Sequence, residues 1–151
     1  MGVPTYLIAS VVRGVLAQRL ARRICPDCKE KYVPEQSELQ GLSFQPPEGS
    51  GPVLYRGRGC EECRGTGYRG RLGIYELLTL DEPLRRSILK GVSASELKIE
   101  AQRPAAGTAP SRAQHSAATP RLTTLYQDAM QKVQSGQTTV QEVLRTIQAD
   151  E

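Results

Sequence analysis

Four cysteines form two C-x-x-C pairs, and they are the residues of this chain whose spacing best suits metal binding. They are Cys25, Cys28, Cys60 and Cys63. Two such pairs brought together supply four thiolates, which is the ligand set of a closed tetrahedral zinc site. A zinc ion held by four thiolates has no open coordination position, so we expect this site to organise the fold and not to catalyse a reaction.

The same cysteines allow three other interpretations. Disulfides need an oxidising compartment, but the first residues lack a basic export-signal region and Arg13 interrupts the apolar stretch. A thioredoxin-like redox pair would use one C-x-x-C and leave the other without a role. An iron–sulfur cluster takes the same four ligands and stays open as an alternative, although the spacing favours zinc.

Composition indicates small subdomains or a fragment of a larger protein. The chain has 151 residues, of which 38% are hydrophobic, with no Trp and one Phe, so its core is thin for its length. No run of about 20 apolar residues is present to span a membrane. The net charge is +4, but basic and acidic residues alternate without an aromatic platform, which favours a solvated surface over specific nucleic-acid binding.

Apolar periodicity predicts a helix over residues 5–16, and residues 18–24 suit a short strand that leads into the first cysteine pair. Residues 29–59, between the pairs, are rich in proline and glycine, so we expect a loop stapled by the metal, with a brief helix around 34–42. If the metal organises this loop, a chelator should unfold it and leave the terminal helices largely intact.

Turn and capping signals divide the second half. Residues 68–78 are predicted to be extended, Asp81-Glu82-Pro83 opens a helix that Gly91 ends, and Ser93 with Glu96 forms a capping box for another helix. Two final helices are expected, one over residues 123–134 and one opened by a capping box at Thr139 and Glu142. We expect both to pack on the preceding helices.

An abrupt change of composition marks residues 103–121, which we expect to be a flexible insertion rich in Ala, Pro, Ser and Thr. His115, the single histidine, falls inside it. Because the four cysteines already complete a site, we expect His115 to be a solvated linker residue.

Several of these segments, in the same order, resemble the ATPase motors of type II secretion and type IV pilus assembly. The matching segments are GVPTYLIAS (2–10), VLAQRLARRICPDC (15–28), GCEECRGTGY (59–68), GRLGIYELL (70–78) and GQTTVQEVLR (136–145). The chain departs from that pattern at the 103–121 insertion and at Asp128-Ala129, where Asp-Gly is common.

The resemblance implies an α+β fold with three parts: the tail of a RecA-like ATPase core, a small four-cysteine zinc-binding subdomain and a C-terminal helical subdomain. The implied divisions are residues 1–24 for the core tail, 25–68 for the zinc-binding insert, 69–102 for an extended segment and helices, 103–121 for the insertion and 122–151 for the C-terminal helices.

The resemblance also implies a function, that of the C-terminal portion of a hexameric motor. Its implied partners are the other subunits of the homohexamer and an inner-membrane platform protein, which would place it in the cytoplasm, peripheral to the inner membrane. The metal would be zinc, while ATP and Mg²⁺ would bind only in the complete parent enzyme. The chain contains no G-x-x-x-x-G-K-[ST] loop, so no catalytic or nucleotide-binding residue is assigned and we expect the chain alone to be inactive.

Two functions as a stand-alone zinc-binding interaction module remain as alternatives. Residues 60–67 have the C-x-x-C-x-G-x-G form of the zinc domain of J-protein cochaperones, but only one copy is present. A nucleic-acid-binding zinc ribbon would use the arginines near the second pair, which are Arg56, Arg58, Arg64, Arg69 and Arg71. Charge alone supports only non-specific contact.

Overall fold

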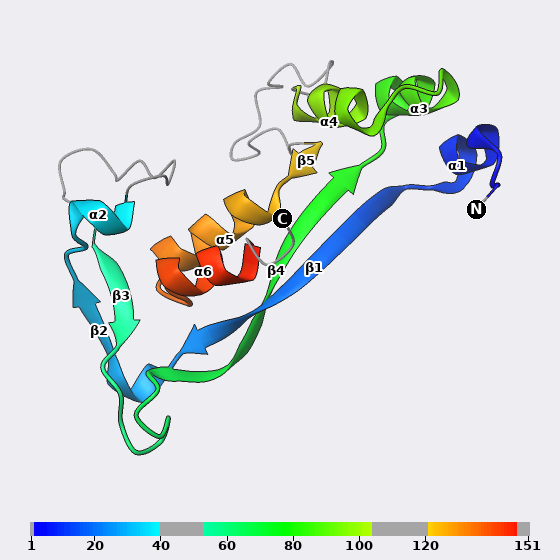
Figure 1. Cartoon of the computed structure of the whole chain (residues 1–151). Helices are drawn as coiled ribbons and strands as arrows, with labels where there is room; N and C mark the ends of the chain where they lie inside the picture. The colour runs from blue at the N-terminus through cyan, green and yellow to red at the C-terminus, as the bar shows by residue number, and fades with distance from the viewer. Residues whose placement is uncertain (1, 40–52, 104–120, 148–151) are drawn as a thin grey trace, which may run out of the picture. The chain divides into compact units, whose positions relative to one another are not determined.

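The chain forms two compact units, each assembled from stretches that are far apart in the sequence. The computed structural model describes residues 2–39, 53–103 and 121–147 (Figure 1). The first unit consists of residues 1–17 and 76–124, and the second of residues 18–75 and 125–151. The strands form a three-stranded sheet of order β1-β4-β5 and a separate two-stranded sheet, β2-β3. The expected mixture of helices and small sheets is thus confirmed, while a RecA-like core stays a prediction.

In the first unit, α1 (Thr5–Val11) packs on α3 (Glu82–Leu89). The Arg85 guanidinium of α3 donates hydrogen bonds to the carbonyl of Ala9 and, at 2.9 Å, to that of Val12. Carbonyls at a helix C-terminus have no partner within the helix, and here a cation satisfies them. Arg85 therefore joins the end of α1 to α3, in addition to the packing of the two helices.

The predicted helix over residues 5–16 was too long. It ends at Val11, and Val15 and Leu16 belong to β1 (Gly14–Ile24), which includes the strand expected over residues 18–24. Val12 is already extended, and the carbonyl of Arg13 accepts the N–H of Leu80 at 3.0 Å. The i, i+4 spacing of the apolar residues did not reveal this change, but β-branched valines on either side of Gly14 favour extended backbone.

Both predicted helix starts in the first unit are confirmed. The Asp81 carboxylate accepts the N–H of Leu84 at 3.2 Å, and Gly91, after α3, has a φ of +69°. In α4 (Ala94–Gln102), the Ser93 hydroxyl accepts the N–H of Glu96, and the Glu96 carboxylate accepts the N–H of Ser93 at 2.8 Å. The capping box read from the sequence is thus complete.

Arg121 ties the start of β5 (Leu122–Thr123) to the helices of the first unit. Its buried guanidinium lies 2.5 Å from the Asp81 carboxylate and 3.6 Å from that of Glu100, and its carbonyl accepts the N–H of Thr79 at 2.8 Å. The predicted insertion before it lies mostly outside the described residues, as residues 104–120, and so does His115.

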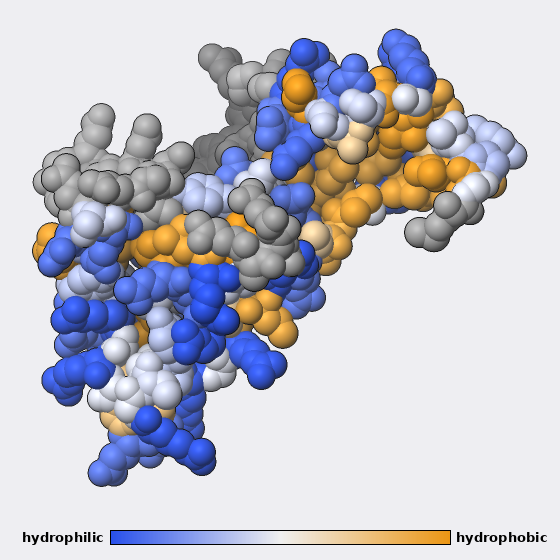
Figure 2. Space-filling model, in the orientation of Figure 1, coloured by the Kyte–Doolittle hydropathy of each residue, from blue (hydrophilic) through white to orange (hydrophobic). Residues whose placement is uncertain are grey.

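The first unit leaves many large apolar side chains exposed, and Figure 2 shows hydrophobic side chains gathered over its elements. The exposed residues are Val3, Tyr6, Leu7, Val11, Val15, Leu16, Leu77, Leu89 and Ile99. Across residues 2–39, 53–103 and 121–147, no helix has the length and apolar character needed to cross a membrane.

In the second unit, the stretch expected to be a loop contains a pair of antiparallel strands. β2 (Lys29–Tyr32) pairs with β3 (Leu54–Gly57), with Lys29 opposite Gly57 and Tyr32 opposite Leu54. The loop prediction for residues 29–59 was therefore wrong at both ends. Each strand is only four residues long, β2 is largely polar, and the cross-strand ion pair of Glu30 and Arg56 at 2.9 Å exists only once the strands pair.

The brief helix expected around residues 34–42 is present as α2 (Gln36–Leu39). Residues 40–42 lie outside the described part of the chain.

The core of the second unit joins strands to the last two helices, α5 (Leu125–Gln134) and α6 (Val140–Ile147). Its buried residues are Ala21, Leu54, Ile74, Ala129, Val133, Val140 and Val143. These helices therefore share their core with the strands, and not with α3 and α4, which belong to the first unit. The helix predicted from residue 123 begins at Leu125, because Leu122 and Thr123 pair with β4 (Tyr68–Thr79).

The capping box predicted for α6 is only half formed. The Thr139 hydroxyl accepts the N–H of Glu142 at 3.2 Å, as expected. The carboxylate of Glu142, however, accepts hydrogen bonds from the N–H of Arg22 at 3.0 Å, from its Nε at 2.9 Å and from Arg145 at 2.6 Å. A long-range partner 120 positions away has replaced the local one, which spacing within the helix does not reveal.

Glu142 makes the stability of the second unit depend on pH. Burial by itself raises the pKa of this carboxyl group, but hydrogen bonds from Arg145 and Arg22 outweigh it and lower the pKa to about 2. A carboxylate whose folded pKa lies below the unfolded value, about 4.3, stabilises the fold above that pH and loses the contribution as pH falls. The affected range runs from about pH 5 to about pH 2.

We therefore expect Glu142→Gln to lower the free energy of unfolding at pH 7 by about 2 to 3 kcal/mol, a value that allows for the partial exposure of both arginines. The difference from the wild type should shrink to near zero around pH 2. Denaturant unfolding followed by circular dichroism at stepped pH measures it. Glu61→Gln, at an exposed position, is the control, and an equal loss at pH 7 and pH 2 would contradict the electrostatic origin.

Candidate metal centre

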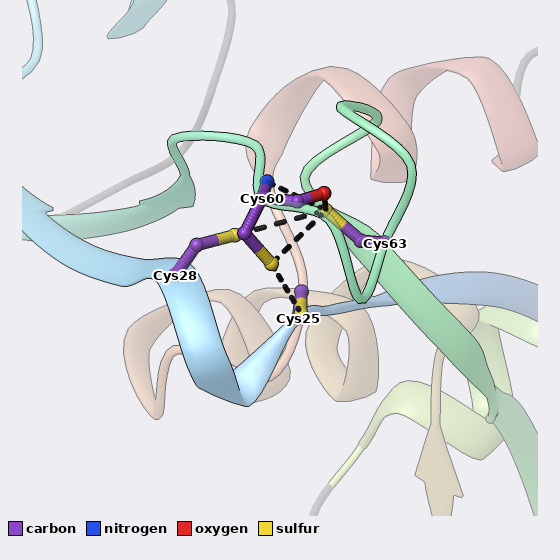
Figure 3. A group of neighbouring side chains, drawn as sticks. All are labelled: Cys25, Cys28, Cys60 and Cys63. Atoms are coloured by element: carbon purple, nitrogen blue, oxygen red, sulfur yellow. Dashed lines mark hydrogen bonds between the residues drawn. The ribbon is translucent and has the colours of Figure 1, made fainter.

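The four cysteines meet at one point of the second unit. Their Sγ atoms all lie within 4.8 Å of one another (Figure 3). The Sγ–Sγ distances are 3.9 Å for Cys25–Cys60, 3.9 Å for Cys28–Cys63 and 3.7 Å for Cys60–Cys63. A tetrahedral zinc ion with Zn–S bonds of about 2.3 Å separates its sulfur ligands by about 3.8 Å. All four thiols are free, so the arrangement fits a four-thiolate metal centre and not a pair of disulfides.

The first pair is delivered by the end of β1. Cys25 directly follows Ile24, and η1 (Pro26–Cys28) turns the chain so that Cys28 joins it. Pro26 suits the first position of this short helix, because its φ is already close to the helical value. The N–H of Cys25 donates to the carbonyl of Gly67 at 2.9 Å, which fastens this pair to the segment behind the other one.

The second pair is held by a tight turn between β3 and β4. The carbonyl of Cys60 accepts the N–H of Gly65 at 2.9 Å, and Arg64 has a φ of +55°, in the left-handed region. Behind this turn, Gly57 and Gly67 approach so closely that a Cβ on either would collide with the backbone of the other. Glycine is needed at both positions for the second pair to reach the first.

Backbone N–H groups surround two of the sulfur atoms. Cys63 Sγ accepts the N–H of Cys60 and that of Gly67, each at 3.2 Å, and Cys28 Sγ accepts the N–H of Gly59 at 3.3 Å. Donors placed in this way stabilise thiolate over thiol.

Burial and these donors oppose each other in setting the cysteine pKa values. Burial raises the pKa of Cys25 to about 12 and raises that of Cys28 as well. Burial also pushes the pKa of Cys63 upward, but the N–H groups of Cys60 and Gly67 outweigh it and lower the pKa to about 6. A metal ion that takes four thiolates must therefore displace protons from the buried thiols.

Charged residues beside the cysteines form exposed ion pairs. Arg69 lies 3.1 Å from Asp27 and 3.3 Å from Glu62, and so links the two C-x-x-C loops. All three side chains are about half exposed, so this pair of contacts adds little stability. Arg69 and Arg56 therefore have acidic partners within the protein, which weakens the nucleic-acid alternative.

The structure brings together all four cysteines that spacing singled out. Spacing did not reveal the close approach of Gly57 and Gly67, although the glycines after Cys63 indicated a tight turn. Nor did it reveal that Arg22 and Tyr68, on either side of the cysteines, bind residues at the start of α6. Both contacts join positions more than 70 residues apart, and only the folded chain shows them.

Comparison with known proteins places the chain in a family. The model of the family described as "Type II/IV secretion system protein" matches residues 1–145. This chain belongs to that family.

Individual relatives support the assignment. The chain is 40% identical over 149 residues to the "Type IV pilus assembly ATPase PilB" of Thermus thermophilus, covering 98% of this chain and 15% of the relative. It is 41% identical over 145 residues to the "Type II secretion system protein E" of Pseudomonas aeruginosa, covering 96% of this chain and 25% of the relative. The "Type II secretion system ATPase E" of Vibrio cholerae is 38% identical over 147 residues, with 96% and 25% covered. The chain thus spans a quarter or less of the length of these relatives.

We expect the purified chain to contain a single zinc ion, and its removal to destabilise more than the loop between the cysteine pairs. Leu54 of β3 shares a core with α5 and α6, so loss of the metal should also loosen these helices. Elemental analysis combined with thermal unfolding, with and without a chelator, measures both effects.

Cys28→Ser should bind zinc weakly and unfold like the chelated wild type, whereas Ser37→Ala, on the exposed surface of the same unit, should behave like the metal-bound protein. If the purified chain contained iron and absorbed visible light, the iron–sulfur cluster alternative would be correct. Unchanged unfolding after complete metal removal would argue against a structural site.

Proposed function

We propose that this chain is the C-terminal portion of a hexameric ATPase motor that powers type II secretion or type IV pilus assembly. Within the motor it supplies an arm held together by zinc, formed by residues 25–68, and a C-terminal helical subdomain, formed by residues 122–151. It does not supply the catalytic site. The observation that carries the proposal is 40% identity, over 98% of the chain, to a relative named as a pilus assembly ATPase, together with the convergence of the four cysteines.

The metal in this proposal is zinc, held by Cys25, Cys28, Cys60 and Cys63. Four thiolates leave no position for a substrate or for water, so the ion supplies cross-linking and no Lewis-acid chemistry. The chain's own residues hold the arm through the Cys25–Gly67 hydrogen bond and the turn at Cys60–Gly65. ATP and Mg²⁺ belong to the complete parent enzyme.

The arm transmits movement in this proposal. It is attached through β1 and β4, and both strands continue into the first unit, whose apolar surface suits further protein contacts. Residues 1–24 would belong to the ATPase core, 25–68 to the zinc-binding insert, 69–102 to an extended segment with helices and 122–151 to the C-terminal helices.

The partners in this proposal are identical subunits of the hexamer and an inner-membrane platform protein. The motor would work in the cytoplasm, at the inner membrane, through these partners. The names of the relatives, which refer to secretion and to pilus assembly, support membership of such a machine.

We expect the purified 151-residue chain to show no ATP turnover, because no phosphate-binding lysine loop is present in its sequence. The in-frame DNA upstream of the Met1 codon should encode a Walker A loop and its acidic partner. A complete parent protein with Cys60→Ser should still bind ATP but support secretion or piliation poorly.

The control is the parent with its Walker A lysine replaced, which should lose ATP binding and keep its zinc. ATP turnover by the isolated chain, or a stop codon directly upstream of Met1, would contradict the proposal.

A further inference from the structure

Arg22, three positions before the first cysteine, lies in a stretch of β1 that makes several hydrogen bonds to residues in and just before the first turn of α6. The Glu142 carboxylate accepts its N–H at 3.0 Å and its Nε at 2.9 Å, and lies 2.7 Å from a terminal guanidinium nitrogen. The Thr138 hydroxyl donates to the carbonyl of Arg22 at 2.9 Å. Two residues further on, the N–H of Ile24 donates to the carbonyl of Gln137 at 2.9 Å. These hydrogen bonds therefore set the register of the last part of β1 against residues 137–142.

Tyr68, the first residue of β4, follows the second cysteine pair, just as Arg22 precedes the first pair. Its hydroxyl lies 2.7 Å from that of Thr139, and the guanidinium of Arg22 lies 4.2 Å from the centre of its ring. Both Thr139 and Glu142 are more than nine-tenths buried. One helical turn thus touches both chain segments that connect the cysteines to the sheet.

Burying the Glu142 carboxylate carries a desolvation cost, which the hydrogen bonds from Arg22 and Arg145 offset. Ion pairs at buried positions are often no more stabilising than apolar residues of similar size, and in some proteins their role is to fix the register of the groups they join. The Glu142 carboxylate uses both oxygens on Arg22, one of them on its backbone N–H. This arrangement fixes the position of the backbone that carries Cys25.

We propose that the first turn of α6 acts as a clamp on the metal arm, the segment 25–68 that carries the four cysteines. Glu142 and Thr139 are its positioning residues. They hold the two chain segments that flank this arm, at Arg22 and Tyr68, at the spacing that the four thiolates require. This inference rests on the proposed metal binding. By thermodynamic linkage, metal binding and the docking of α6 favour each other to the same extent. A partner that displaces α6 would therefore loosen the metal arm.

The test uses the full chain with Co²⁺ as a spectroscopic probe, competed against a chelator. Glu142→Gln should weaken Co²⁺ binding about tenfold, at the lower end of the range for groups that orient metal ligands, while the four-thiolate spectrum stays unchanged. Tyr68→Phe, which removes a single hydroxyl, should weaken binding in the same direction and keeps the test valid if Glu142→Gln folds poorly. Glu96→Gln is the matched control, since Glu96 holds the same position in α4 and lies in the first unit.

The rates of amide hydrogen exchange in the metal-free chain provide a second measurement, which does not depend on metal binding. The N–H groups of Ile24 and Cys25 should exchange faster in both clamp variants than in the wild type or in Glu96→Gln. Unchanged Co²⁺ affinity together with unchanged exchange at these two amides would overturn the clamp. If the wild type bound no Co²⁺, the proposed metal function would fail, and the exchange rates would still decide whether the clamp exists.

Discussion

Bringing four cysteine sulfurs within 4.8 Å of one another is the constraint on which the second unit depends. Thiolates at this distance repel each other, and buried thiols resist ionisation, so the two pairs need groups that offset both costs. The backbone meets this requirement with hydrogen bonds between the pairs and with N–H groups directed at sulfur. The close approach of Gly57 and Gly67 allows the second cysteine pair to come near enough to the first.

The rest of the unit supports that arrangement from outside. The two-stranded sheet closes the chain between the cysteine pairs, and its Leu54 enters the same core as α5 and α6. On the other side, Glu142 and Thr139 reach the segments on which the cysteines are carried. The cysteines, the β2–β3 pair and the C-terminal helices are consequently linked within one unit, although they are far apart in the chain.

Membership of the secretion family gives this architecture a context. The chain spans a quarter or less of the relatives it matches, and its first unit exposes a series of large apolar residues. An exposed apolar surface of this kind is typical of a contact with further protein. In the proposed function, a metal-stabilised arm carried on two strands would pass movement without changing its own shape, because a four-thiolate centre restricts the chain that it closes.

Local signals in the sequence determined the features that depend on neighbouring residues. Cysteine spacing identified the four clustered residues, and Asp81, Ser93 and Glu96 marked helix starts that the structure confirms, because caps act over three or four positions. Family resemblance rested on several such motifs in order. The end of α1 at Val11, the β2–β3 pair and the partner of Glu142 were decided only by tertiary structure. Strand pairing and a long-range ion pair are set by residues distant in the chain, and periodicity within a segment contains no information about them.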